Sequence, residues 1–196
     1  MTYTTLLPLA WFLLVASITP GPNNTMLAAS GMNFGLRRTT GHIAGIVIGF
    51  ASLVFLCALG LGTLYEQVPE VRIALKTAGA AYLLYLAWRI ARAGEVQSGS
   101  AARPLTLWQA AAFQYVNPKA WVMGLTATSS FLPDSAPLTG ALTMLAVAMI
   151  VAAPSTLIWT LFGTGLARLW SGRRVRRAIN LTLALLLVAT VPFIIL

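Results

Sequence analysis

The stretch Thr19-Pro20-Gly21-Pro22-Asn23-Asn24 interrupts the first apolar segment of the chain with helix breakers and amide side chains. A later apolar segment is interrupted in the same way by Asn117-Pro118-Lys119. In lipid an unpaired backbone amide or carbonyl costs several kcal/mol, so a helix is broken there only where protein or a polar cavity satisfies the freed groups. We therefore interpret the two breaks as parts of one candidate binding site.

The composition places the chain among integral membrane proteins. Of its 196 residues 58% are hydrophobic and 9% are charged, with a mean hydropathy of +0.82, whereas a soluble domain carries about 25% charged residues. The net charge of +9 does not indicate nucleic-acid binding. The basic residues lie in short loops between apolar segments, where an anionic membrane surface attracts them. The lone Cys57 predicts no disulfide within the chain and is interpreted as a packing residue.

Six segments are apolar and long enough to cross a bilayer as helices, since a hydrocarbon core about 30 Å thick needs roughly 20 helical residues. The sequence thus predicts an all-α fold, a single domain of six transmembrane helices. The expected ranges are 4–28, 38–64, 69–92, 107–131, 137–168 and 177–196. The first is not interpreted as a signal peptide, because it lacks a positively charged start and five more apolar segments follow.

Loop charges predict how these helices are oriented. Most of the 13 basic residues lie in the loops after the first, third and fifth segments. The opposite loops hold Glu66, Glu70 and Asp134. By the positive-inside rule the basic loops face the cytoplasm, and both termini are expected outside.

Residues 93–106 have the composition of a linker and divide the chain into halves, 1–92 and 107–196, with three segments each. Because three is odd, halves of the same fold must cross the membrane in opposite senses, which makes an inverted-topology repeat. Each half begins with a proline-broken segment. We therefore expect a 3+3 inverted repeat whose first and fourth helices are broken.

The chemistry of the first break suits a zwitterion. Pro20 and Pro22 release carbonyls from the helical ladder, and Gly21 lets the backbone turn between them. Such carbonyls can accept hydrogen bonds from an ammonium group. Asn23 and Asn24 stand where they can cap a restarted helix, whose positive end favours a carboxylate.

The second break adds a positive charge. It lies about ten residues into its segment, near the bilayer midplane at roughly 1.5 Å per residue. Lys119 is too deep to reach water, so we expect it to face the bundle interior and to pair with an anion or a carbonyl. For each break taken alone, a structural kink without a ligand is the alternative.

Other polar and small residues receive secondary roles. Titratable groups near segment ends are candidates for proton coupling or gating: His42, Glu66, Glu70 and Lys76. The alternatives are a hydrogen-bonded interfacial histidine for His42 and a side chain that reaches the membrane surface for Lys76. Three glycines spaced by four form a bare stripe for helix packing, within the chain or in a homodimer: Gly41, Gly45 and Gly49.

No catalytic constellation is evident in the sequence. The chain has one histidine, one cysteine and four scattered acidic residues, with no metal-ligand spacing and no phosphate-binding glycine loop. We expect no enzyme activity, no metal and no cofactor.

Three motifs resemble one family of transporters. Residues 19–49, TPGPNNTMLAASGMNFGLRRTTGHIAGIVIG, resemble the signature region of the LysE/RhtB superfamily of bacterial amino-acid exporters. Residues 79–88, GAAYLLYLAW, and 113–120, FQYVNPKA, resemble its third-span and fourth-span motifs. The chain is most similar to the RhtB side and to its cysteine and O-acetylserine exporter branch.

The resemblance implies a secondary transporter that exports a small amino acid or derivative across the bacterial inner membrane by alternating access, as an antiporter coupled to protons. Both termini would then be periplasmic, and the partners would be a zwitterionic substrate and membrane lipid. The expected substrate-binding residues are Pro20, Gly21, Pro22, Asn23, Asn24, Gln114, Asn117, Pro118 and Lys119.

The distribution of acidic residues narrows the expected substrate. A site for lysine or arginine needs a buried acid, and no Asp or Glu lies deep in a segment. We therefore expect neutral substrates of the cysteine, O-acetylserine, homoserine or threonine type. A non-transporting membrane scaffold, a channel and an exporter of another small zwitterion are the alternatives.

Overall fold

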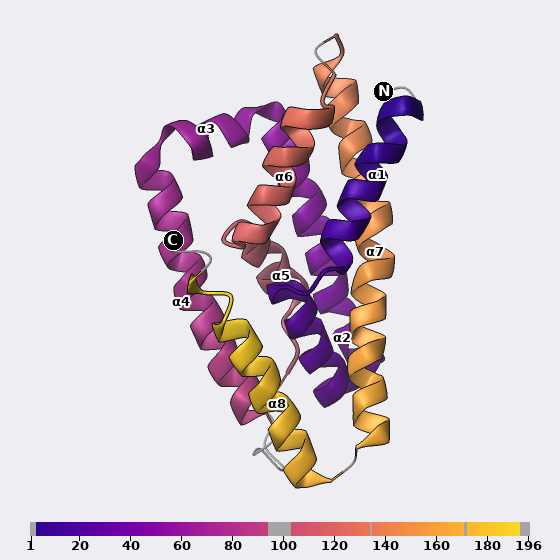
Figure 1. Cartoon of the computed structure of the whole chain (residues 1–196), viewed down its shortest axis with the longest axis vertical. Coiled ribbons are helices and arrows are strands. Elements are labelled where there is room, and N and C mark those ends of the chain that lie inside the picture. Colours follow the sequence, from indigo (N-terminus) through magenta and orange to yellow (C-terminus); the bar gives the residue numbers. More distant parts are fainter. Residues whose placement is uncertain (1–2, 94–102, 134, 171, 193–196) are drawn as a thin grey trace.

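The computed structural model describes residues 3–93, 103–133, 135–170 and 172–192. All regular structure in these ranges is helical, which confirms the expected all-α class (Figure 1). The elements are α1 (Tyr3–Ile18), α2 (Pro22–Leu56), the π-helical turn η1 (Cys57–Leu61), α3 (Gly62–Gln67), α4 (Pro69–Arg92), α5 (Leu107–Gln114), α6 (Pro118–Phe131), α7 (Pro137–Leu169) and α8 (Arg173–Val188).

Helix α2 is a hairpin of two helical arms, because the chain reverses direction at Gly35. Gly35 has φ 75° and ψ 167°, in the positive-φ region that favours glycine. Across the reversal the hydroxyl oxygens of Ser30 and Thr39 lie 3.1 Å apart. Residues 22–34 are called arm one and residues 36–56 arm two.

Both helix breaks fall where the prolines predict them. Helix α1 ends at Ile18 and α2 starts at Pro22, while α5 ends at Gln114 and α6 starts at Pro118. Each proline occupies the first turn of its helix, where the missing N–H would be unpaired anyway and the fixed φ is already helical. The two breaks lie together near mid-height of the bundle (Figure 1).

Two buried apolar clusters lie on either side of these breaks. One joins α1, arm two, α6 and α7, with Leu13, Val54, Trp121 and Met144 among its members. The other joins arm one, α4, α5 and α8, with Leu27, Leu83, Phe113 and Leu187. In lipid, helices associate by close packing rather than by escape from water. The breaks therefore sit between two separately packed regions.

Small residues let arm two approach α5 to backbone contact. A Cβ atom at Gly49 would lie 2.6 Å from the Cα atom of Ala111, and Gly45 faces the Leu107 carbonyl just as closely. At Gly41 a Cβ atom would have 3.8 Å to its nearest neighbour. The glycine stripe thus packs within the chain at Gly45 and Gly49.

Within the described ranges two helices are long and apolar enough to cross a membrane by length and composition, Pro22–Gln67 and Pro137–Leu169. The first of these folds back on itself at Gly35. The first helix break leaves α1 as a shorter apolar piece, Thr4–Ile18. The six-segment count and the inverted repeat therefore remain predictions.

Several helix ends differ from the sequence prediction. Arm one continues to residue 34 rather than ending at 28, and arm two begins at 36 rather than 38, because Gly35 alone interrupts the helix. Helix α8 begins at Arg173 rather than at residue 177, because extended backbone at Gly172 lets the arginines form its first turn. The segment predicted to end at residue 64 loses its regular helix at Leu56, where a π turn containing Gly60 at φ 109° leads into α3. Most of the predicted linker 93–106 and Asp134 lie outside the described residues.

Replacing Gly49 with leucine is expected to destabilise the bundle, because the new side chain would overlap the backbone of α5. Overpacking of this kind costs about 1–3 kcal/mol. Thermal unfolding in detergent, followed by size-exclusion chromatography, should show a lower midpoint than for the parent chain. Gly165→Leu on α7 is the matched control, since a Cβ atom at Gly165 has no neighbour within 4 Å. Equal effects of the two changes would contradict this packing.

Candidate functional site

The two helix breaks meet through a pair of amide side chains. Asn23 Nδ2 donates to Gln114 Oε1 over 2.8 Å, and Gln114 Nε2 donates back to Asn23 Oδ1 over 3.1 Å. Gln114 is fully buried, and its Nε2 also donates to the Ala110 carbonyl. Asn23 lies at the start of α2 and Gln114 at the end of α5, so this pair joins the two halves of the chain.

Lys119 reaches from the second break to the first. Its Nζ donates to the carbonyl oxygen of Thr19 over 2.7 Å, to Thr19 Oγ1 over 3.0 Å and to the Pro20 carbonyl over 3.3 Å. These three acceptors match the three hydrogens of an ammonium group. Gly21 makes room for the side chain, because a Cβ atom there would lie 2.9 Å from Lys119 Cδ.

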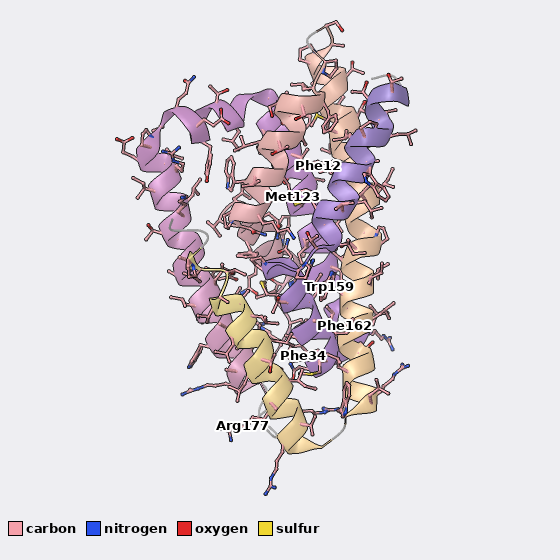
Figure 2. The ribbon with its side chains drawn as sticks, in the orientation of Figure 1. Phe12, Phe34, Met123, Trp159, Phe162 and Arg177 are labelled. Carbon is pink, nitrogen blue, oxygen red and sulfur yellow. The ribbon has the colours of Figure 1, made fainter. Side chains whose placement is uncertain are left out.

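The other carbonyls at the end of α1 also have donors. Asn24 Nδ2 donates to the carbonyl of Ser17 over 2.9 Å. From α7, Ser155 Oγ donates to the same oxygen over 3.0 Å, and Trp159 Nε1 donates to the Ile18 carbonyl over 3.1 Å. Trp159 is labelled in Figure 2. Each carbonyl that the break releases thus has a donor, which is the condition for an interrupted helix in lipid.

Part of the first break lies at the surface of the chain. Thr19 and Pro20 are exposed, whereas Gly21 and Pro22 are buried. Broken backbone can face lipid only where its polar atoms are paired. The carbonyls of both exposed residues accept hydrogen bonds from Lys119, so the ammonium satisfies the polar backbone atoms at this part of the break.

Helices α2 and α6 both begin at this site. The side chain of Asn117 accepts a hydrogen bond from the Lys119 amide over 3.2 Å and caps α6. Helix α2 starts after Gly21 with no side-chain cap, so the expectation that Asn23 or Asn24 caps it is wrong. Both asparagines lie within the helix, because Pro22 sets its start, and their amides bond to α5 and α1 instead. The positive ends of two helix dipoles thus lie at the site.

A cavity of about 40 Å³ lies between the two breaks, lined by residues that include Asn24, Phe50, Lys119, Ser155 and Thr156. A water molecule occupies about 30 Å³ in the liquid, and pockets for small ligands start at about 300 Å³. The lining contains no carboxylate. The structure therefore shows a polar, cationic site that is closed around Lys119.

The residues predicted to handle protons lie elsewhere. Glu66 on α3 and Glu70 on α4 are exposed, Lys76 is partly buried on α4, and none of them lines the break cavity. His42 on arm two is 2% exposed and lines a separate cavity. Neither of its ring nitrogens has a hydrogen-bond partner among the described residues.

Sequence reasoning missed the contribution of α7 and of one threonine. Thr19 accepts from Lys119 twice, while Ser155 and Trp159 supply donors to the first break. The available signal is the pair Ser155-Thr156, which follows Pro154 inside an otherwise apolar helix. Among the described residues no group of His, Cys, Asp and Glu side chains could hold a metal ion.

Comparison with known proteins identifies the family of the chain. A family model described as "LysE type translocator" matches residues 14–193. Proteins named cysteine/O-acetylserine efflux protein, from Escherichia coli K12, Escherichia coli O9:H4 strain HS and Shigella sonnei strain Ss046, are each 36% identical over 186 residues, or 94% of either chain. No solved structure matches the chain.

The family model and the efflux-protein relatives identify a membrane transport protein rather than an enzyme. The chain belongs to the family of LysE type translocators. The resemblance to the LysE/RhtB superfamily drawn from the three motifs is confirmed, and with it the expectation that the protein is not an enzyme.

The amide pair should be visible as an energetic coupling. Asn23→Ala, Gln114→Ala and the double variant are expected to be non-additive in unfolding free energy by about 0.5–3 kcal/mol, because each change removes the side-chain partner of the other amide. The measurement is denaturant unfolding in detergent. Asn23→Ala combined with Asn180→Ala is the control, since Asn180 pairs with Asn33 instead. Equal coupling in both cycles would contradict a specific pair.

Proposed function

We propose that this translocator exports small neutral amino acids or close derivatives out of the cytoplasm. The observation that carries the proposal is the Lys119 ammonium, which donates to the carbonyls of Thr19 and Pro20 beside the starts of α2 and α6. The lining of the site contains no carboxylate. Such a site lacks an anion, and the carboxylate of an amino acid supplies one. The relatives named as cysteine/O-acetylserine efflux proteins support a cargo of this size and charge.

The contacts at the first break suggest how the cargo binds. The carbonyls of Thr19 and Pro20, which hold the Lys119 ammonium, have the geometry that the ammonium of an amino acid needs. In the proposed mechanism the cargo ammonium takes these oxygens, and Lys119 swings to the cargo carboxylate beside the starts of α2 and α6. The site of about 40 Å³ opens as Lys119 leaves it.

The polar atoms at the site also favour a neutral cargo. Lysine or arginine would bring a second cation next to Lys119, and no acid in the lining would compensate for it. Asn24, Ser155 and Thr156 are uncharged, so they suit a short side chain with a hydroxyl, thiol or ester group. Zwitterions with a small neutral side chain are therefore the proposed cargo class.

The proposed transport cycle is alternating access by a 3+3 inverted repeat of six spans. The amide pair and the Lys119 contacts both join residues about a hundred positions apart, one from each half of the chain. Half-helices that start at the same depth and run in opposite directions, as arm one and α6 do in Figure 1, support this arrangement. Rocking of the halves would expose the site to each side in turn.

We propose a location in the bacterial inner membrane with both termini in the periplasm. Arg168, Arg174 and Arg177 gather at the end of the bundle where α7 meets α8, and Figure 2 shows Arg177 there. The positive-inside rule places this end in the cytoplasm. Coupling to protons is part of the proposal, with His42 on the cytoplasmic side and Glu66 and Glu70 on the outer side as candidate carriers. An efflux rate that does not respond to an imposed pH gradient would contradict coupling.

Removal of the Lys119 charge is the direct test of the site. Lys119→Met is expected to lower counterflow of small neutral amino acids in reconstituted vesicles by roughly two orders of magnitude, since a hydrogen bond to a charged group contributes up to about 3 kcal/mol. Arg72→Met on the exposed side of α4 is the matched control and should transport normally.

The outcome separates the proposal from its alternatives. Normal transport by the Lys119→Met variant, or lysine as the preferred cargo of the parent chain, would overturn it. Passive flux that does not saturate would indicate a channel. A parent chain that moves no amino acid, with membrane levels unchanged, would favour a scaffold.

Cysteine labelling checks the orientation. In a Cys57→Ser background, Thr139→Cys at the start of α7 should react with a membrane-impermeant maleimide added to the periplasmic side. Gly172→Cys, before α8, should react only after the cytoplasmic side is opened. The reverse pattern would place the termini in the cytoplasm and contradict the proposed topology.

A further inference from the structure

A second and much larger cavity lies below the break site. It has a volume of about 320 Å³ and is bounded by arm one, the last turns of α4 and residues 103–105. This size falls in the range of about 300–1,000 Å³ found for small-molecule pockets. Phe34, one of its lining residues, lies toward the arginine-bearing end of the bundle in Figure 2.

His42 gives this cavity an unpartnered polar group. The imidazole is 2% exposed and lines the cavity, and neither ring nitrogen has a hydrogen-bond partner among the described residues. A buried polar group without a partner carries its full desolvation penalty. A neutral imidazole offers one acceptor and one donor. A polar molecule inside the cavity would supply the partner that the described residues do not.

Positive charge surrounds the same cavity. Arg89, Arg92 and Arg103 all line it, and Arg89 Nη2 donates to the carbonyl of Arg103 over 3.0 Å. The described carboxylates, Glu66 and Glu70, lie at or before the opposite end of α4, about 28 Å away along the helix. These three arginines favour a ligand with an anionic group.

The cavity lies in line with the break site. Asn23, Met26, Ser30 and Asn33 are spaced by three or four residues and so follow one face of arm one. Asn23 lines the break cavity, while Met26, Ser30 and Asn33 line the larger one. Met26 packs in one apolar cluster with Ile46, which lines the break cavity. Members of one apolar cluster, Met26 and Ile46, therefore line one cavity each.

We propose that the larger cavity is a second binding site for the exported cargo, which an amino-acid zwitterion occupies from the cytoplasmic side before it reaches Lys119. The guanidinium groups of Arg89 and Arg92 bind its carboxylate. A ring nitrogen of His42 accepts a hydrogen bond from its ammonium group, and the apolar wall covers its side chain. This assignment rests on the proposed function, since it takes the cargo to be an amino acid.

Protection of a cysteine inside the cavity tests the proposal. In the Cys57→Ser background, Ala29→Cys places a thiol in the cavity lining, and Ser30→Cys is a second probe if the first variant does not fold. Inside-out vesicles expose the cytoplasmic side to a small methanethiosulfonate reagent. O-acetyl-L-serine should slow the labelling several-fold, and it should do so equally after Lys119→Met, because the second site does not use Lys119.

Variants of the lining give the matched comparison. Arg89→Gln and His42→Phe are each expected to raise the O-acetyl-L-serine concentration for half-protection by about tenfold. The first variant loses the contact with the cargo carboxylate, and the second loses the hydrogen bond from the cargo ammonium. Arg168→Gln on α7 lies outside this lining and should leave it unchanged. N-acetylserine, which lacks the ammonium group, should protect more weakly than O-acetyl-L-serine.

Three results would overturn the proposal. Protection that disappears with Lys119→Met would show that the cargo acts only through the break site, and the proposed function would stand without a second site. Protection by phosphatidylglycerol but not by O-acetyl-L-serine would make the cavity a lipid site. Absence of protection by any of these molecules would exclude the second site. If protection occurs while the parent chain shows no counterflow, the proposed function fails and the binding site remains.

Discussion

The bond between the Lys119 ammonium and the backbone oxygens of Thr19 and Pro20 is the interaction on which the centre of this bundle depends. Oxygens released by a helix break are costly in lipid, and so is a lysine at the same depth. Here each group compensates the other without an acidic side chain. Because the two partners come from different halves of the chain, the same bond also fixes how α6 sits against α1.

Local chemistry made part of this architecture predictable. A proline acts on its own turn, so Pro22 and Pro118 set the starts of α2 and α6, and the depth of Lys119 indicated that it would seek an oxygen. Tertiary partners were not predictable from one sequence. Whether Asn24 caps its own helix or bonds to α1 depends on which acceptors lie nearby, and the donors from Ser155 and Trp159 come from a helix more than 130 residues away.

The two cavities and the two apolar clusters describe one conformation. Above the breaks, side chains from α1, arm two, α6 and α7 fill the bundle, with Leu13 and Met144 fully buried. Below the breaks, arm one and α4 leave room for a molecule of amino-acid size. Under the proposed alternating access and orientation, this distribution of space is that of a state open to the cytoplasm. Arm one is the wall that both cavities share, so a shift of this short half-helix would change both volumes together.

The hydrogen bonds from Lys119 to the first break have a consequence for the proton gradient across the membrane. While Lys119 occupies the oxygens of the first break, the halves stay joined, and no other basic side chain lines the break cavity to replace it. Under the proposed mechanism only a cargo that carries both an ammonium and a carboxylate can release these hydrogen bonds and accept the lysine in return. Idle turnover, which would leak protons without moving a metabolite, is then suppressed by the same atoms that recognise the cargo.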